Sequence, residues 1–166
     1  MSAWLHWCGG ARHCCPLGEA GAGSGAAAAG LANRTRPFTV DVHCHVLTLS
    51  VERLVASHPR RLAESMDMLA SMGDASVAHN QAVMLPRAFP GLTAIEQRFV
   101  DMDAMGVDLQ VISPSPNQYY YWAERDLARE VVRLQNEHIA ELCAQSPARL
   151  RGLGTVSPHH PDLAAQ

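Results

Sequence analysis

The chain has 166 residues, 48% of them hydrophobic, which is enough for one folded domain with a sizeable core. Its formal net charge is -3, and no long run of like charge occurs. This balance excludes the strongly basic surface with which proteins bind nucleic acids or anionic lipids. We therefore expect neither a nucleic-acid partner nor a membrane partner.

The five cysteines do not form the framework of a disulfide-rich protein. Three lie close together near the start (Cys8, Cys14 and Cys15), and Cys44 and Cys143 stand alone in apolar patterns. No apolar stretch reaches the roughly 18 residues that a membrane-spanning helix needs. These features predict a cytoplasmic protein.

Residues 1–36 differ in composition from the rest of the chain. They contain a long Gly/Ala tract with almost no large side chains, which buries too little surface to offset the entropy of ordering. We expect a disordered tail here and a folded domain in residues 37–166. An organelle transit peptide is an open alternative, and a secretory signal fits less well because the apolar tract is weak.

The first half of the folded domain begins with a strand pattern. Residues 38–46 alternate large apolar and polar side chains, which predicts a strand. Residues 49–80 show apolar side chains at helical spacing, interrupted by Pro59 and ended by Gly73, and predict one or two helices. Residues 83–91 contain two prolines and a glycine and predict a loop.

A helix and a strand are predicted next. Thr93 and Glu96 have the spacing of a capping box, so a helix should begin at Thr93. The apolar stripe of this helix is Ile95, Phe99, Met102 and Met105, and Gly106 should end it. A mostly apolar strand follows over residues 107–113.

The last elements repeat the order of helix and strand. Residues 122–145 carry a helical stripe made of Leu127, Val131, Leu134, His138 and Leu142, and residues 150–156 form a third strand. Strands that alternate with helices predict a parallel sheet with helical crossovers. The open doubly wound sheet and the start of a (β/α)8 barrel both fit, but no glycine-rich phosphate turn follows the first strand, which disfavours a dinucleotide-binding sheet.

His43 and His45 are two residues apart on the first predicted strand. Side chains alternate between the faces of a strand, so both imidazoles should project from one side, where a single metal ion can reach both. A catalytic zinc site usually has three protein ligands, so the pair is only part of a site. On spacing alone, a pair of hydrogen-bonded or solvent-facing histidines is favoured over a metal site.

Several stretches resemble one enzyme family. The segment Val40-Asp41-Val42-His43-Cys44-His45 resembles the first strand of the amidohydrolase superfamily. Four later stretches, in the same order, are similar to its aminocarboxymuconate-semialdehyde decarboxylase branch: residues 99–113, 120–123, 136–140 and 151–156. The resemblance covers residues 38–163 and implies an α/β fold, namely the first three βα units of an incomplete TIM (β/α)8 barrel.

The resemblance also implies site residues. His43 and His45 match two ligands of a divalent metal, with zinc expected ahead of manganese, and Cys44 should face the helices as a small buried side chain. The other ligands of the family lie on later strands. Arg87 matches loosely an arginine that pairs with a substrate carboxylate, although a solvated loop arginine is the favoured interpretation.

The function implied is that of a metal-dependent, non-oxidative decarboxylase of a small carboxylated aromatic or muconate-type acid. A hydrolase of the same superfamily and an inactive truncated product are the alternatives. We expect a full-length relative to be a homo-oligomer. Only three barrel strands are present, so we expect the chain alone to lack activity and to associate through uncovered apolar surface.

Further candidate residues lie outside the metal pair. His138 lies on an apolar helix stripe, where a hydrogen-bonded structural histidine is favoured over a functional one. His159 and His160 follow the third strand and could line a cleft near the mouth of a barrel. The aromatic run 119–122 follows the second strand, where helix packing and pocket lining are both open.

Overall fold

The computed structural model describes residues 36–165, and its contacts divide the chain into Met1–Phe38 and Thr39–Gln166. The second unit carries all the described helices and strands. The predicted disorder of residues 1–36 falls almost entirely outside the described residues. No helix in the described range is long and apolar enough to cross a membrane.

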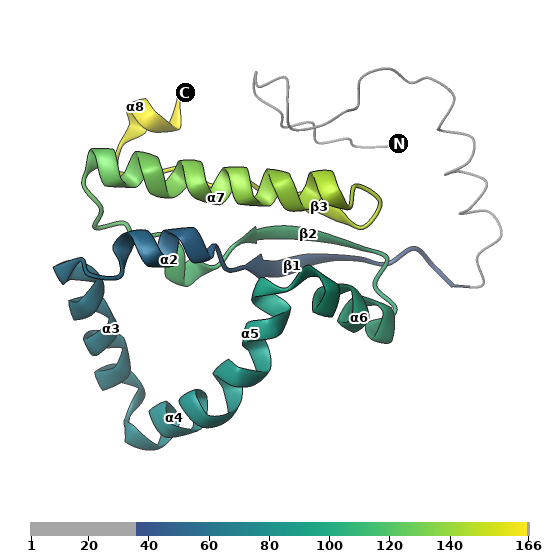
Figure 1. Cartoon of the computed structure of the whole chain (residues 1–166), viewed down its shortest axis with the longest axis horizontal. Helices are drawn as coiled ribbons and strands as arrows, with labels where there is room; N and C mark the ends of the chain where they lie inside the picture. Colours follow the sequence, from purple (N-terminus) through teal and green to yellow (C-terminus); the bar gives the residue numbers. More distant parts are fainter. Residues whose placement is uncertain (1–35, 166) are drawn as a thin grey trace. The chain divides into compact units, whose positions relative to one another are not determined.

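Three parallel strands form the sheet, in the order β1-β2-β3 (Figure 1). They are β1 (Val40–Val46), β2 (Leu109–Pro114) and β3 (Leu150–Gly152). The alternation of strands and helices therefore predicted the sheet correctly: the fold is α/β with parallel strands.

Two helices, α6 (Ile95–Met105) and α7 (Arg125–Gln145), pack side chains against the apolar face of the sheet. One apolar cluster combines Cys44, Val46, Ile112, Ile139 and Leu150, with side chains of α6 and α7 packed against it. This cluster confirms the expectation that Cys44 faces the helices. A second cluster joins α2 (Leu49–Val55) to the first half of α7 through Val51, Val55, Ala128 and Val131.

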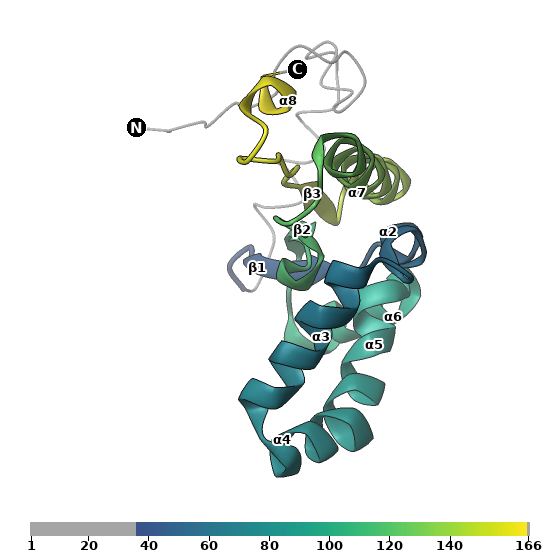
Figure 2. The same ribbon diagram turned by 90° about the vertical axis from the view of Figure 1, so that its left-hand side faces the viewer.

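A helical arm, Pro59–Thr93, connects α2 to α6. It consists of α3 (Pro59–Met72), α4 (Asp74–His79), a π-helix (Asn80–Met84) and α5 (Leu85–Thr93). Figures 1 and 2 show the arm leaving the sheet after α2 and returning to it before α6. Residues 81–90 are all exposed, and apolar side chains such as Met66 and Phe89 remain open to solvent.

The predicted loop at residues 83–91 was wrong, because this stretch is helical. Pro86 lies in the first turn of α5, which follows the π-helix without a break. Pro90 lies inside α5, and the helix nevertheless continues to Thr93. Proline therefore does not mark the end of a helix in this stretch.

The predicted capping box was also wrong. Thr93 is the last residue of α5, and its Oγ1 donates to the carbonyl of Phe89 at 2.8 Å. The N-cap of α6 is Ala94, which has no side-chain hydrogen bond to offer. The predicted end was correct, because Gly106 closes α6 in the left-handed conformation, with φ 70°.

The buried faces of the two long helices differ from the predicted stripes. Met105 of α6 is 63% exposed, whereas Arg98, outside the predicted stripe, is buried. In α7 the buried positions are Ala128, Val131, Gln135 and Ile139, so the buried face is rotated by about one residue from the predicted stripe.

The third strand is shorter than the predicted 150–156. It ends at Gly152, because Asn136 of α7 binds the backbone further on: Thr155 N–H donates to Asn136 Oδ1 at 2.7 Å, and Asn136 Nδ2 donates to Thr155 O at 3.0 Å. A helix side chain thus takes the hydrogen bonds that a continued strand would have made. The last described helix is α8 (Pro161–Ala164).

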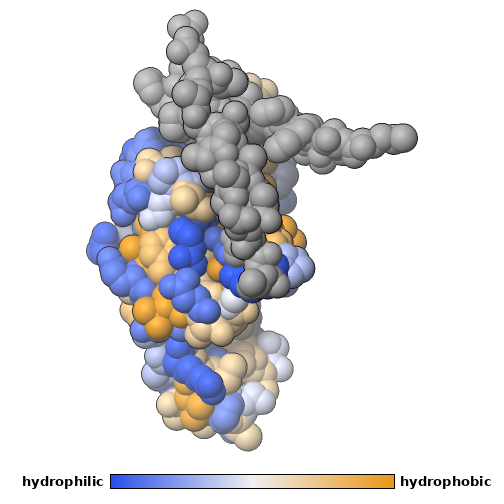
Figure 3. Space-filling view, turned by 90° about the vertical axis from the view of Figure 1, so that its right-hand side faces the viewer, coloured by the Kyte–Doolittle hydropathy of each residue, from blue (hydrophilic) through white to orange (hydrophobic). Residues whose placement is uncertain are grey.

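Surface hydropathy is mixed on the face drawn in Figure 3, where hydrophobic side chains interrupt a hydrophilic surface. The large exposed apolar residues of the domain include Val42, Leu62, Met66, Val100 and Leu153.

Candidate metal site and its supports

The imidazoles of His43 and His45 lie side by side near the carboxyl end of β1. Their ring centroids are 5.3 Å apart, with the planes at 90°. His43 is exposed and His45 is half-buried, so both rings are open to a ligand to some degree. This is the arrangement that the spacing of two residues on a strand predicts.

A bulge in β1 sets which face the imidazoles occupy. Asp41 pairs with Gln110 and Cys44 with Ile112, so three steps along β1 match two steps along β2. The extra residue lets Asp41 and Cys44 share the helix-covered face and leaves Val42 71% exposed. His43 and His45 consequently project away from the buried side chains of Cys44 and Val46.

Arg98 ties the backbone of His45 to the end of the helical arm. Its Nη2 donates to the carbonyl of His45 at 2.6 Å and to the carbonyl of Gly91 at 2.7 Å. Arg98 is buried, and burial lowers the pKa of its guanidinium. A buried cation that donates to two carbonyls fixes both segments against α6.

The same arginine begins a polar chain that returns to β1. Arg98 Nη1 donates to Gln110 Oε1 at 2.8 Å, and Gln110 Nε2 donates to Asp41 Oδ2 at 3.1 Å. Asp41 Oδ1 accepts the backbone N–H of His43 at 3.0 Å. One hydrogen-bonded network, from Arg98 through Gln110 to Asp41, therefore holds the backbones of both histidines.

Cys44 lies between the two histidines but on the opposite face. Burial, with the negative charge of Asp41 as a smaller cause, raises the pKa of its thiol to about 11. The thiol donates weakly to the carbonyl of Val111. Cys44 is thus a protonated core side chain, not a thiolate ligand.

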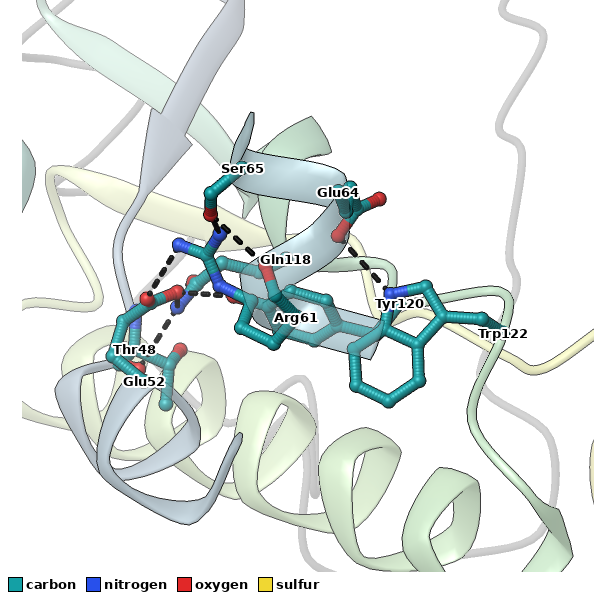
Figure 4. Close-up of polar contacts among 8 residues, drawn as sticks. All are labelled: Thr48, Glu52, Arg61, Glu64, Ser65, Gln118, Tyr120 and Trp122. Atoms are coloured by element: carbon teal, nitrogen blue, oxygen red, sulfur yellow. Dashed lines mark hydrogen bonds and ion pairs between the residues drawn. The ribbon is translucent and has the colours of Figure 1, made fainter. Parts of the chain in front are cut away.

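A second polar cluster joins α2, α3 and the segment after β2 (Figure 4). Glu52 is its centre: Oε1 accepts from Tyr120 Oη at 2.5 Å and from Gln118 Nε2 at 2.9 Å, and Oε2 accepts from Arg61 Nη2 at 3.3 Å. Burial and the Glu52 carboxylate raise the pKa of Tyr120, so its phenol remains a donor.

Gln118 anchors this cluster to the backbone after β1. Its side-chain amide accepts from Thr48 N–H at 2.8 Å and donates to Thr48 O at 3.0 Å, and Gln118 itself is fully buried. Tyr120 has a positive φ of 44°, a conformation that costs energy for a side chain of this size. The bonds around Glu52 hold this strained turn in place.

An aromatic group lies on the loops that follow β2 and β3. Tyr119 and Tyr121 stack with centroids 5.6 Å apart, and Tyr121 contacts His159 at 5.5 Å. His160 Nε2 lies 3.1 Å from the carbonyl of Ala123. The structure thus brings Tyr119, Tyr121 and His159 together, whereas Tyr120 and Trp122 contact α2 and α3.

The remaining predicted residues lie on helices, outside the strand that carries the histidine pair. Arg87 is exposed on α5, and its pairing with a substrate carboxylate stays a prediction. His138 is half-buried on α7, and burial lowers the pKa of its imidazole. Among residues 36–165, no group of three or more His, Cys, Asp or Glu side chains is placed to hold a metal ion.

Several supporting residues were missed by sequence reasoning. Arg98 and Gln110 interrupt apolar patterns at positions that face the core, and such a charged or amide side chain within a buried stripe was the available signal. Glu52, Gln118 and Tyr120 gave no comparable signal, because they meet only when the segments after β1 and β2 lie together.

Comparison with known proteins supports the resemblance found in the sequence. The chain is 34% identical over 59 residues to a 2-amino-3-carboxymuconate-6-semialdehyde decarboxylase of Dictyostelium discoideum, and 25% identical over 130 residues to one of Caenorhabditis elegans. These alignments cover 36% and 70% of this chain, but only 16% and 29% of the two relatives. No family model matches the sequence.

Solved structures contain the same fold. A 5-carboxyvanillate decarboxylase from Novosphingobium aromaticivorans, in complex with manganese and 4-hydroxy-3-methoxy-5-nitrobenzoic acid, superposes with a TM-score of 0.63 at 22% identity. The match covers 77% of this chain and 36% of that protein. The chain thus resembles aminocarboxymuconate-semialdehyde decarboxylases in sequence and a 5-carboxyvanillate decarboxylase in fold, over about a third or less of their length.

Proposed function

We propose that this chain forms the first three βα units of a metal-dependent (β/α)8-barrel decarboxylase, in which His43 and His45 are two ligands of a divalent metal. The observation that carries the metal role is the pair of adjacent imidazoles, 5.3 Å apart, near the carboxyl end of β1. Active sites of (β/α)8 barrels lie at this end of the strands.

The donor set fits a divalent transition metal. Imidazole nitrogen is a preferred ligand of such ions, and two rings on one face of a strand can approach the same ion. The remaining ligands of the family lie on later barrel strands. We propose manganese ahead of zinc, because manganese is the metal of the solved decarboxylase that shares this fold.

The proposed reaction is the non-oxidative decarboxylation of a small acid with an aromatic ring or a muconate-type chain. The metal would supply electrostatic stabilisation of the charge that develops as carbon dioxide leaves. The protein's own contribution from these residues is positional: Arg98 and Asp41 hold the backbones of His45 and His43, and the buried core keeps Cys44 out of the ligand set.

Paramagnetic broadening tests the ligand role with residue resolution. Manganese titrated into the 15N-labelled 166-residue chain should broaden the ring signals of His43 and His45 before those of His79, which is exposed on α4. His43→Ala should weaken the effect at His45, and His79→Ala should not. Uniform broadening of all histidines would refute the ligand role.

Carbon dioxide release tests the reaction. Manganese-dependent release from hydroxybenzoate-type or muconate-type acids, measured with a complete barrel that contains this segment, should be abolished by His43→Ala and by His45→Ala. Unchanged turnover in these variants would contradict the proposal. The 166-residue chain assayed in parallel checks the prediction that it has no turnover by itself.

A further inference from the structure

The side chain of His45 has defined partners on one ring nitrogen. Nδ1 lies 2.9 Å from Ser113 Oγ and 3.1 Å from the backbone carbonyl oxygen of Pro114. The neighbouring ligand candidate differs: among the bonds between described residues, none involves a ring nitrogen of His43. Contacts with neighbouring residues therefore orient the ring of His45, whereas no bond between described residues orients the ring of His43.

The chemistry of these partners determines which nitrogen carries the proton. A carbonyl oxygen can only accept a hydrogen bond, so the contact with Pro114 requires a proton on Nδ1. Ser113 Oγ is 3.4 Å from the carbonyl of Cys44, to which its hydroxyl can donate while its lone pair accepts from Nδ1. Both contacts are thus consistent with the same tautomer of His45.

The strand pairing keeps these partners in place. His45 of β1 and Ser113 of β2 are direct partners in the parallel register, and Val46 is paired with Pro114. The next backbone bond, from Ser115 N–H to Val46 O at 2.9 Å, closes the ladder. Pro114 and Ser115 are buried, so the accepting carbonyl belongs to an ordered segment.

We infer that Ser113 and the Pro114 carbonyl hold His45 in the Nδ1–H tautomer and leave the Nε2 lone pair as the metal donor, with Ser113 as a positioning residue. Histidines that bind metals generally donate their other ring N–H to a carbonyl, carboxylate or water, which fixes the ring and raises the basicity of the ligating nitrogen. The metal-binding half of this inference rests on the ligand role proposed above for His45.

Ring-nitrogen NMR spectra of the metal-free chain test the tautomer directly. At a pH where imidazoles are neutral, His45 should show a protonated Nδ1 and an unprotonated Nε2, whereas exposed His43 should show the exchange-averaged pattern of a free imidazole. A protonated Nε2 at His45 would overturn the inference, whatever the metal does.

Substitution of Ser113 tests the positioning role. Ser113→Ala should reduce the Nδ1–H population of His45 and weaken manganese affinity at His45 by about 10-fold to 100-fold. Ser113→Thr keeps the hydroxyl and should restore both. Ser115→Ala, two residues further along, is the matched control, because the hydroxyl of Ser115 is not a partner of His45. Amide spectra of each variant verify that the sheet is intact.

The outcomes separate this inference from the proposed function. If manganese binds at His43 and His45 but Ser113→Ala changes neither the tautomer nor the affinity, the positioning role is wrong and the metal site stands. If His45 shows the expected tautomer but no divalent metal binds to a complete barrel that contains this segment, the metal site is wrong, and with it the role of Nε2 as a donor.

Discussion

The guanidinium of Arg98 donates to the backbone carbonyl of His45 at 2.6 Å, from a helix that begins fifty residues later in the chain. Arg98→Met keeps an apolar stem but removes bonds to His45, Gly91 and Gln110, and leaves these groups buried without a donor. We expect a loss of about 3 kcal/mol in the free energy of unfolding, measured by urea denaturation.

A control for that variant is Arg129→Ala, which removes an exposed arginine paired with Asp126 on α7. Exposed pairs of this kind contribute little, so its unfolding midpoint should stay close to that of the parent chain. Equal losses in the two variants would show that the buried bonds of Arg98 do not stabilise the fold.

Tyr120→Phe should destabilise the turn after β2. It removes the phenol that donates to Glu52 at 2.5 Å and leaves a partly buried carboxylate with one donor fewer, so we expect a loss of about 1–3 kcal/mol. Glu52→Gln should lessen the effect of Tyr120→Phe in a double-mutant cycle, because the two residues interact directly. Tyr121→Phe, at an exposed ring, is the control, and strictly additive losses for Tyr120 and Glu52 would contradict the contact.

Gly152→Ala should overpack the junction of β3 and α7. A Cβ at this position would lie 2.3 Å from Cγ2 of Ile139 and 3.2 Å from Sγ of Cys143, so we expect a cost of about 1–3 kcal/mol. In an Ile139→Ala background the same substitution should cost much less. Gly91→Ala, where the nearest atom is an Asp101 oxygen at 3.6 Å, should be tolerated; the packing would be mistaken if both glycine variants behaved alike.

The pH dependence of stability should report the burial of Cys44. The folded chain keeps the thiol protonated up to a pKa of about 11, whereas the unfolded thiol ionises near its ordinary value of 9.0. The unfolded state therefore loses the proton first, and the free energy of unfolding should fall as the pH rises from about 9 to about 11. Cys44→Ala should flatten this fall. An identical slope in that variant would show that Cys44 is not the cause.

Alkylation checks the same thiol at lower pH. Iodoacetamide labelling followed by peptide mass analysis should modify Cys44 much more slowly than Cys143, because the thiolate is the nucleophile and Cys44 is both buried and protonated. Rapid labelling of Cys44 in the folded chain would contradict its placement in the core.

Much of the fold was predictable from local patterns. The strand β1, the apolar strand β2 and Gly106 at the end of α6 depend on neighbouring residues, and the structure has all three. The predicted alternation holds only from Cys44 to Val46, because Val40 and Val42 are exposed. The predicted loop at 83–91 was wrong because the chain stays helical through both Pro86 and Pro90. The spacing of His43 and His45 likewise predicted their adjacency.

The supports of the site were not predictable in the same way. Arg98 binds carbonyls of Gly91 and His45, and a backbone acceptor has no signature in the sequence. The bulge in β1 arises because three steps along β1 pair with two steps along β2, and this register is known only once the two strands are paired. Local chemistry thus identified the imidazoles but not the groups that hold them.

The bulge also determines which changes of chain length the site can tolerate. Cys44 and Val46 have their side chains in the core, so the alternation along β1 places His43 and His45 on the other face. Asp41 does not set this face, because it lies before the bulge. Insertions or deletions before Val42 can be accommodated at the bulge, where the pairing of β1 with β2 is already irregular. One residue added between Cys44 and Val46 would instead turn an imidazole into the core, so a library of single-residue insertions should divide sharply at this point of the strand.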